Sequence, residues 1–144
     1  MLDDTYFMKQ ALMEAQRAFE TDEVPIGAVI VCQKKIIARA HNQVELLNDP
    51  TAHAEILCLT AAANKVGSKY LPDYTLYITL EPCPMCAAAT AWAQLDRICF
   101  AANDPKRGYS CFQPSLLHKK TMVSQGILAQ ESTELLRSFF AKKR

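Results

Sequence analysis

The sequence has few glycines and no long apolar run. Only 4 of its 144 residues are glycine, and no Ser/Gly linker, internal repeat or low-complexity tract interrupts the chain. We therefore expect one domain spanning residues 1–144, long enough to bury a hydrophobic core without disulfide staples. The acidic N-terminus leads into an amphipathic segment, so neither a signal peptide nor a membrane span is expected. A cytoplasmic location without a membrane partner follows as the default expectation.

The chain also lacks a strong net charge, because its formal value is only +1. This balance hides an asymmetry: residues 1–96 contain seven Lys and Arg against twelve Asp and Glu, whereas residues 97–144 contain nine against three. The positive charge gathers at Lys106-Arg107, Lys119-Lys120 and Lys142-Lys143-Arg144. Such patches attract phosphate groups even on a nearly neutral protein, although a solvated surface explains them equally well.

The periodicity of apolar residues predicts an α/β fold. Helical patterns cover residues 5–20, 50–65, 84–94 and 131–142, and strand patterns cover residues 26–32, 35–40, 75–80, 97–102 and 122–125. Pro50 is expected at the first helical position of its helix, and a short helical turn is expected at residues 115–117. The order of these elements predicts a three-layer α/β/α sandwich around a mixed central sheet of about five strands.

Two short motifs supply three metal-binding side chains and one additional carboxylate. His53-Ala54-Glu55 is followed at a distance by Pro82-Cys83-Pro84-Met85-Cys86. Each motif falls at the start of a predicted helix, so packing the two helices side by side would bring their N-termini together and favour thiolates there. The six cysteines have no secretory context, so we interpret them as thiols and ligands and predict no disulfide.

We interpret His53, Cys83 and Cys86 as the ligands of one Zn²⁺ ion. One imidazole and two thiolates leave a position of the zinc tetrahedron for water, whereas a structural zinc site is normally closed by a fourth protein ligand. Glu55 is placed to act as the catalytic acid and base toward that water. The alternative is a closed site in which Glu55 only caps a helix, and its candidate fourth ligands are Cys32, Cys58, Cys99, Cys111 and His118.

These motifs resemble those of the cytidine/deoxycytidylate deaminase superfamily, and the whole chain is most similar to the bacterial tRNA-specific adenosine deaminases of the TadA type. The resemblance to the tRNA branch rests on Val24-Pro25-Ile26-Gly27 and on a C-terminal helix with Phe139, Phe140 and a basic end. It implies a zinc-dependent hydrolase, homodimeric, that converts adenosine to inosine at the wobble position of a tRNA anticodon. Zinc-bound hydroxide would attack C6 of a flipped base, and Glu55 would protonate N1 and the departing amine.

The resemblance also implies how the substrate is held. An asparagine amide offers the donor and acceptor that an adenine edge requires, and unstacked RNA bases stack on aromatic side chains. The residues implied for the base are Asn42, the Ala54 backbone and Val24, and those implied for the anticodon stem-loop are Asp104, Lys106, Phe139, Phe140 and the basic tail.

Several positions remain open at this point. Phe139 and Phe140 cannot both face the core, so we expect one to be buried and the other exposed. Trp92 is expected to pack in the core or at a dimer interface. Residues 109–118 depart from the family pattern, which leaves the RNA contacts of this segment undetermined, including any role for Cys111 and for His118.

Two other functions compete with this interpretation. A guanine or other free-base deaminase would carry the same zinc motifs, and Ala91-Trp92-Ala93 leans toward that group. Val24-Pro25 and the basic C-terminal third argue against it, since a neutral base needs no positive surface. The second competitor is a non-catalytic, zinc-stabilised RNA-binding module.

Overall fold

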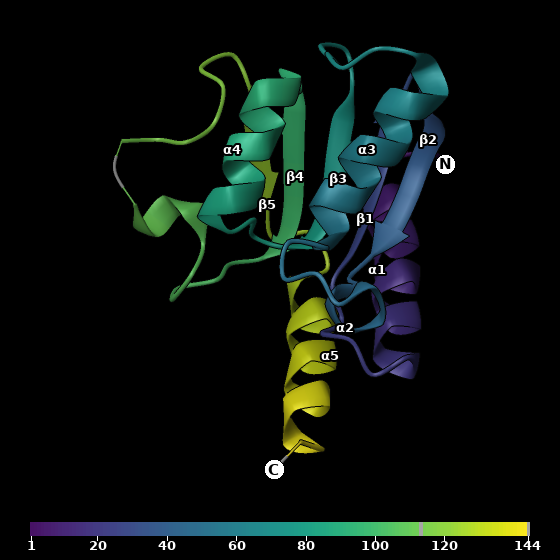
Figure 1. Ribbon diagram of the computed structural model, residues 1–144, viewed down its shortest axis with the longest axis vertical. Coiled ribbons are helices and arrows are strands. Elements are labelled where there is room, and N and C mark those ends of the chain that lie inside the picture. Colours follow the sequence, from purple (N-terminus) through teal and green to yellow (C-terminus); the bar gives the residue numbers. More distant parts are fainter. Residues whose placement is uncertain (113, 144) are drawn as a thin grey trace.

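The computed structural model describes residues 1–112 and 114–143, which form a central sheet with helices on both faces (Figure 1). The helices are α1 (Asp4–Glu20), α2 (Val44–Leu47), α3 (Ala54–Val66), α4 (Pro84–Ala93) and α5 (Ala129–Ala141), with a 3₁₀ helix η1 (Tyr109–Cys111). The strands are β1 (Gly27–Cys32), β2 (Lys35–His41), β3 (Thr75–Leu80), β4 (Arg97–Ala102) and β5 (Met122–Gln125). The predicted three-layer α/β/α architecture is confirmed. No helix among these residues is both long and apolar enough to cross a membrane.

The sheet is mixed, as the sequence predicts. Its five strands follow the order β2-β1-β3-β4-β5, in which β1 is antiparallel to both of its neighbours. The strands β3, β4 and β5 are parallel to one another, and α4 forms the crossover between β3 and β4. The carboxyl ends of β3 and β4 therefore meet at one edge of the sheet, the usual place for a binding site in such folds.

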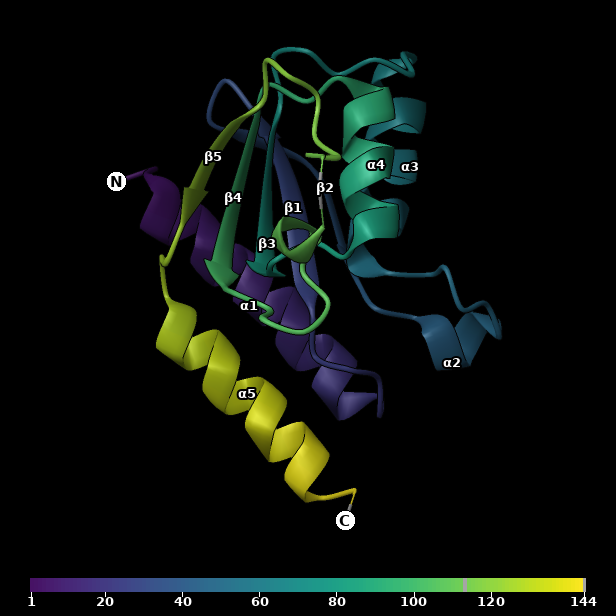
Figure 2. The same ribbon diagram turned by 90° about the vertical axis from the view of Figure 1, so that its left-hand side faces the viewer.

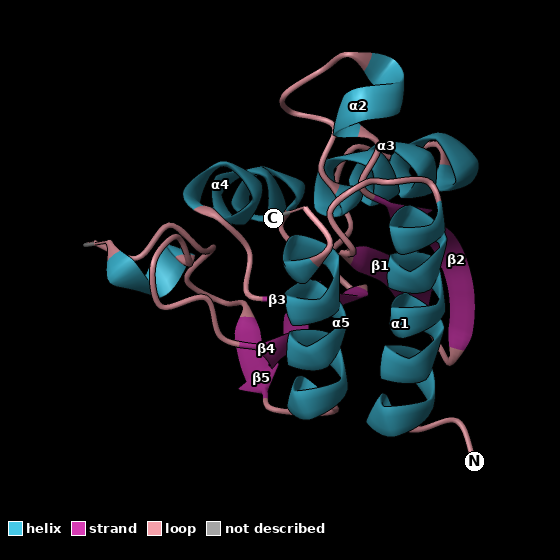
Figure 3. Cartoon of the chain, turned by 90° about the horizontal axis from the view of Figure 1, so that it is seen from below, coloured by secondary structure: helices cyan, strands magenta, loops and turns pink. Residues whose placement is uncertain are grey.

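The helices form two layers. Figures 2 and 3 show α1 and α5 side by side on one face, whereas α3 and α4 cover the other. Successive side chains of β1 point to opposite faces of the sheet. Val29 and Val31 belong to the hydrophobic cluster under α1, whereas Ala28 and Ile30 belong to the cluster under α3. At Gly27 an added Cβ would lie 2.1 Å from the carbonyl oxygen of Ala11, so only glycine lets α1 lie this close to the sheet.

The prediction of a helix beginning at Pro50 is wrong. The carboxylate of Asp49 accepts hydrogen bonds from the backbone N–H and the hydroxyl of Thr51, both at 2.8 Å, which holds this segment in a turn. The helix begins instead at Ala54, after His53 as an extended N-cap residue. This later start places the imidazole of His53 at the N-terminus of the helix.

Two further local predictions differ from the structure. Residues 115–117 form no helical turn, and the 3₁₀ helix lies earlier, at Tyr109–Cys111. The four-residue helix α2 was not predicted, because it is too short to show periodicity. It is stabilised from elsewhere in the chain: the buried carboxylate of Glu23 accepts hydrogen bonds from the backbone N–H groups of Glu45 and Leu46 at 3.0 and 2.8 Å. Gln113 and Arg144 lie outside the described residues.

Candidate metal centre and active site

The two motifs meet at the N-termini of α3 and α4, as the sequence predicts. His53 is the N-cap residue of α3, and Cys83 is the N-cap residue of α4, with Pro84 at the first helical position. Cys86 lies one turn into α4 and is fully buried. Because α3 and α4 pack together on one face of the sheet, their positive helix ends point at the same place.

The geometry of these three side chains suits a tetrahedral metal ion. The Nδ1 atom of His53 lies 3.7 Å from the Sγ of Cys83 and 3.5 Å from the Sγ of Cys86, and all three atoms lie within 4.8 Å of one another. Zinc bonds of about 2.3 Å to sulfur and about 2.1 Å to nitrogen predict an S–N edge of about 3.6 Å. The residues present therefore fit a zinc ion without rearrangement.

No fourth ligand closes this group within residues 1–112 and 114–143. Cys58 and Cys99 are buried in the two hydrophobic clusters, and all six cysteines are free thiols. Cys111 donates to the backbone carbonyl of Pro105 at 3.2 Å, and His118 accepts from the backbone N–H of Lys120. The arrangement thus supports an open metal site rather than the closed alternative.

The electrostatics of the site favour a thiolate next to a partly protonated carboxyl. The hydrogen bond from the Cys86 thiol, with a second contribution from His53, lowers the pKa of Cys83 to about 4. Burial raises the pKa of Glu55 to about 7, and the charge of Cys83 acts in the same direction. Glu55 is only 4% exposed, yet it lines the same cavity as His53 and Cys83. A carboxyl that titrates near neutral pH can both take up and release a proton.

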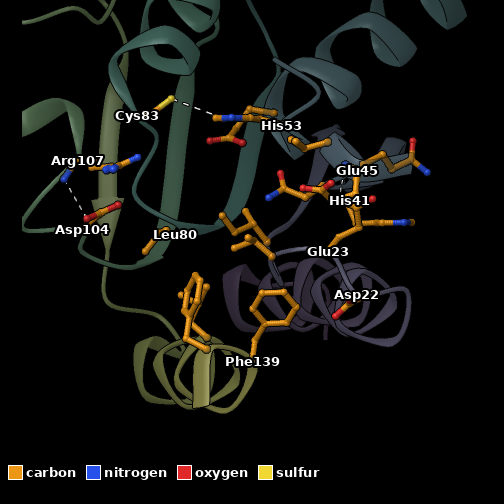
Figure 4. Close-up of a pocket in the computed structure, with 18 of the residues that line it drawn as sticks. Asp22, Glu23, His41, Glu45, His53, Leu80, Cys83, Asp104, Arg107 and Phe139 are labelled. Atoms are coloured by element: carbon orange, nitrogen blue, oxygen red, sulfur yellow. Dashed lines mark hydrogen bonds between the residues drawn. The ribbon is translucent and has the colours of Figure 1, made fainter. Parts of the chain in front are cut away.

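Two side chains of the candidate ligand group, His53 and Cys83, line a broad cavity of about 1500 Å³ (Figure 4). Asn42 and Val24, which the resemblance implies for base binding, line this cavity. The Oδ1 atom of Asn42 accepts the backbone N–H of Ala54 at 2.9 Å, which fixes the orientation of the amide, because only its oxygen can accept. Ala54 is fully buried, and its backbone N–H holds the Asn42 amide in place.

The residues implied for RNA lie around the same cavity. Asp104, Lys106, Phe139 and Phe140 all line it, and so do the cationic residues Arg107 and Lys143. Phe139 is the buried member of its pair at 4% exposed, packing on Phe19, and Phe140 is 48% exposed. Asp104 also shapes its own turn, because its Oδ1 atom accepts from the backbone N–H groups of Lys106 and Arg107 (Figure 4 shows the contact with Arg107).

The basic patches do not all belong to this cavity. Lys119 and Lys120 form the turn before β5, and β5 begins opposite Arg97, the first residue of β4. They lie at the amino ends of the parallel strands, away from the metal site. Among the described residues of these patches, Lys106, Arg107 and Lys143 line the cavity, which separates this positive charge from that of Lys119 and Lys120.

Sequence reasoning missed two buried carboxylates at the cavity, Glu23 and Glu81. Each is 3% exposed and accepts hydrogen bonds from backbone N–H groups, those of helix α2 for Glu23 and those of the loop of residues 103–110 for Glu81. The available signal was their position in the chain, since Glu23 precedes Val24 and Glu81 lies two residues before Cys83. Nothing in the spacing shows which backbone segments they bind.

Comparison with known proteins identifies the family. The family model of MafB19-like deaminases matches residues 2–144. The chain is 46% identical to the tRNA-specific adenosine deaminase of Agrobacterium fabrum, over 100% of this chain and 98% of that protein. It is also similar to a structure from a study of A-to-I editing by tRNA:A34 deaminases at the wobble position, with a TM-score of 0.86, 46% identity, and coverage of 92% of this chain and 99% of that one.

Similarity to a guanine deaminase is less extensive. The enzyme from Bacillus subtilis is 40% identical with a TM-score of 0.65, over 68% of this chain and 63% of that chain. The tRNA-specific adenosine deaminase of Agrobacterium fabrum, in contrast, matches the whole of this chain at 46% identity. The chain is therefore a deaminase and belongs to the tRNA-specific adenosine deaminase family.

Proposed function

We propose that this protein binds one zinc ion and hydrolyses adenosine to inosine at the wobble position of a tRNA anticodon. The observation that carries the proposal is the combination found in one cavity. Two members of the ligand group, His53 and Cys83, and the buried Glu55 line one part of it, here called the floor, whereas aromatic and cationic side chains line another part, here called the rim. A free base would need the floor alone, but a flipped nucleotide in an anticodon loop also needs the rim.

Glu55 is the proposed catalytic residue. A zinc ion held by His53, Cys83 and Cys86 would supply an activated water for the hydrolysis. The Glu55 carboxylate takes one proton from that water and delivers it to N1 of the ring as the water oxygen bonds to C6. It then moves the remaining proton of that oxygen to the amino group, which leaves as ammonia when the C6–N bond breaks. The raised pKa of Glu55 suits a group that must exist in both protonation states during one turnover.

Asn42 is the proposed base-recognition residue. Its amide oxygen is occupied by the Ala54 N–H, so the amide nitrogen is the atom available to the cavity. An N–H donor at this position suits a ring nitrogen acceptor of a purine, such as N7 of adenine. Val24, which also lines the cavity, supplies an apolar surface for the base.

The rim residues are the proposed contacts of the anticodon stem-loop. Phe140 is exposed and can stack with an unpaired base, whereas Lys106, Arg107 and Lys143 can contact phosphates. Asp104 contributes by holding the turn that carries Lys106 and Arg107.

We also propose that the protein acts as a homodimer. Trp92 on α4 is 81% exposed, and Met85 on the same helix is 37% exposed. A tryptophan so exposed on an apolar helix is typical of an interface rather than of a monomer surface.

The decisive experiment compares substrates for the same purified protein. We expect inosine formation in an anticodon stem-loop with adenosine at the wobble position, and no turnover of guanine, cytosine or free adenosine. Glu55→Gln should retain stoichiometric zinc and lose activity by about a thousandfold, because the proton carrier is absent. Turnover of guanine alone would replace the tRNA assignment with the free-base one, and a fully active Glu55→Gln protein would remove the catalytic role.

A further inference from the structure

We infer that Glu81 is a positioning residue. It holds the loop of residues 103–110, and with it the cationic side chains of Lys106 and Arg107, against the turn that carries the proposed metal ligand Cys83. The inference rests on the proposed function in one respect, since the loop is taken to contact the anticodon stem-loop. Glu81 follows the last residue of β3 and lies two positions before Cys83, so its backbone is part of the turn that presents the ligand.

The carboxylate of Glu81 accepts hydrogen bonds from residues near both ends of this loop. Its Oε1 atom accepts the backbone N–H of Asp104 at 3.0 Å, and its Oε2 atom accepts the backbone N–H and the hydroxyl of Ser110 at 3.0 and 2.6 Å. The side chain is 3% exposed, so these groups replace water around the charge. One buried carboxylate therefore holds both ends of the loop.

The backbone on either side of the loop adds to the same attachment. The backbone N–H of Glu81 donates to the carbonyl of Ala102 at 2.8 Å, and the backbone N–H of Tyr109 donates to the carbonyl of Pro82 at 2.9 Å. Between these points the loop makes no regular structure, and its turn is shaped by the side chain of Asp104. Its position is therefore set by the segment around Glu81 rather than by a helix or strand of its own.

Gly108 shows how closely the loop is fitted to this carboxylate. An added Cβ at Gly108 would lie 2.3 Å from both the Cδ and the Oε2 atoms of Glu81. The backbone of Gly108 has φ −65° and ψ 151°, a conformation that any residue adopts. The glycine is thus required for space around Glu81 and not for backbone conformation.

This relationship makes the inference testable by a double-mutant cycle. In the full-length, zinc-loaded protein we would prepare Glu81→Ala, Gly108→Ala and the double variant, and measure inosine formation in an anticodon stem-loop. Each single variant should raise KM about tenfold and leave kcat within about threefold, because the cations lose their fixed position while the metal site is retained. The double variant should be no worse than the worse single variant, since the added methyl group then occupies the space left by the carboxylate.

Two further readouts separate positioning from general destabilisation. Amide hydrogen exchange in residues 104–110 should be faster in Glu81→Ala than in the wild type. The slope of log KM against log salt concentration should fall by about one, because fewer phosphate contacts are made. Glu23→Ala is the matched control, because it removes another buried carboxylate that accepts hydrogen bonds from two backbone N–H groups. The fold-changes in KM caused by Glu23→Ala and by Gly108→Ala should multiply in the double variant. Ser110→Ala removes only the hydroxyl donor at an exposed position, so it should raise KM less than Glu81→Ala does. It takes the place of Glu81→Ala if that variant folds poorly.

The possible outcomes are distinct. Unchanged exchange in residues 104–110 of both Glu81→Ala and Ser110→Ala would overturn the inference. The inference would also be overturned if the increases in KM caused by Glu81→Ala and Gly108→Ala multiplied in the double variant. The same holds if Glu81→Ala lost zinc and lowered kcat while KM stayed constant. A wild-type protein that forms no inosine would instead defeat the proposed function, while the exchange measurement would still test the attachment of the loop.

Discussion

The floor and the rim of the cavity are built in different ways. The floor consists of side chains at the N-termini of α3 and α4, two helices that pack on one face of the sheet. The rim consists of the end of α5, the short helix α2 and the loop of residues 103–110, and Figure 4 shows both sets of side chains around the same space. Regular elements position the floor, whereas single buried carboxylates position much of the rim.

This difference separates chemistry from recognition. The ligand group needs fixed distances of a few ångströms, which two adjacent helix ends provide without long-range adjustment. The rim must match an RNA surface, and a loop tied by Glu81 or a helix tied by Glu23 can change its residues without moving the metal ligands. We expect substitutions in the floor to abolish the reaction and substitutions in the rim to alter substrate affinity.

The largest effect should follow removal of a metal ligand from the floor. Cys86→Ala should lose zinc, lose activity completely and lower the thermal midpoint by roughly 10 °C, because metal binding contributes to folding stability. Metal analysis and thermal unfolding would measure this. Cys111→Ala is the control, since Cys111 is exposed and lies outside the ligand group, and it should retain full zinc. Stoichiometric zinc in Cys86→Ala would contradict the ligand assignment.

A pair of neighbouring residues in α5 sharpens the comparison, because one is core and the other is rim. Phe139→Ala should destabilise the protein by about 3 kcal/mol, since it removes a buried ring that packs on Phe19. Phe140→Ala should change stability little and raise the KM for a stem-loop about tenfold through lost base stacking. Urea unfolding and steady-state kinetics on both variants test this. Equal destabilisation by the two substitutions would show that the assignment of core and rim is wrong.

The sequence predicted that the ligand side chains of the floor would come together, although it placed the start of α3 too early. Local patterns carry the information there: alternation and helical periodicity locate the strands and helices, and the spacing of the two cysteines places one at the N-cap of α4 and the other in its first turn. The approach of His53 to Cys83 follows from two helices starting at the same edge of a sheet. The family resemblance added the identity of the substrate, which no local pattern contains.

The rim could not be predicted because its structure depends on contacts between distant parts of the chain. Helix α2 is capped by Glu23, more than twenty positions away, and the loop of residues 103–110 is held by Glu81. The choice between Phe139 and Phe140 depends on where α5 crosses α1, a feature that helical periodicity leaves open. Similarly, the start of α3 depends on the turn made by Asp49.

The smallest expected effect comes from an ion pair at the amino ends of the parallel strands, remote from both floor and rim. Hydrogen bonds from Arg97 and Tyr77 hold the pKa of Asp4 below its ordinary value. Because the pKa is lowered in the folded state, the stabilisation is present above the unfolded pKa and is lost as the pH falls through the folded pKa. Asp4 is 36% exposed, so we expect Asp4→Asn to cost about 1 kcal/mol at most, or about 3 °C, near pH 7.

Thermal unfolding of Asp4→Asn and the wild type across a pH series tests this expectation. The two midpoints should converge at acid pH, while stem-loop KM and kcat stay unchanged at neutral pH because the ion pair touches no residue of the cavity. Asp22→Asn, which removes a more exposed ion pair with Lys143, should shift the midpoint less. A difference between Asp4→Asn and wild type that persists at acid pH would mean that packing, rather than the charge of Asp4, stabilises this end of the sheet. Altered kinetics in Asp4→Asn would instead connect this end to the cavity and break the separation between recognition and the distant scaffold.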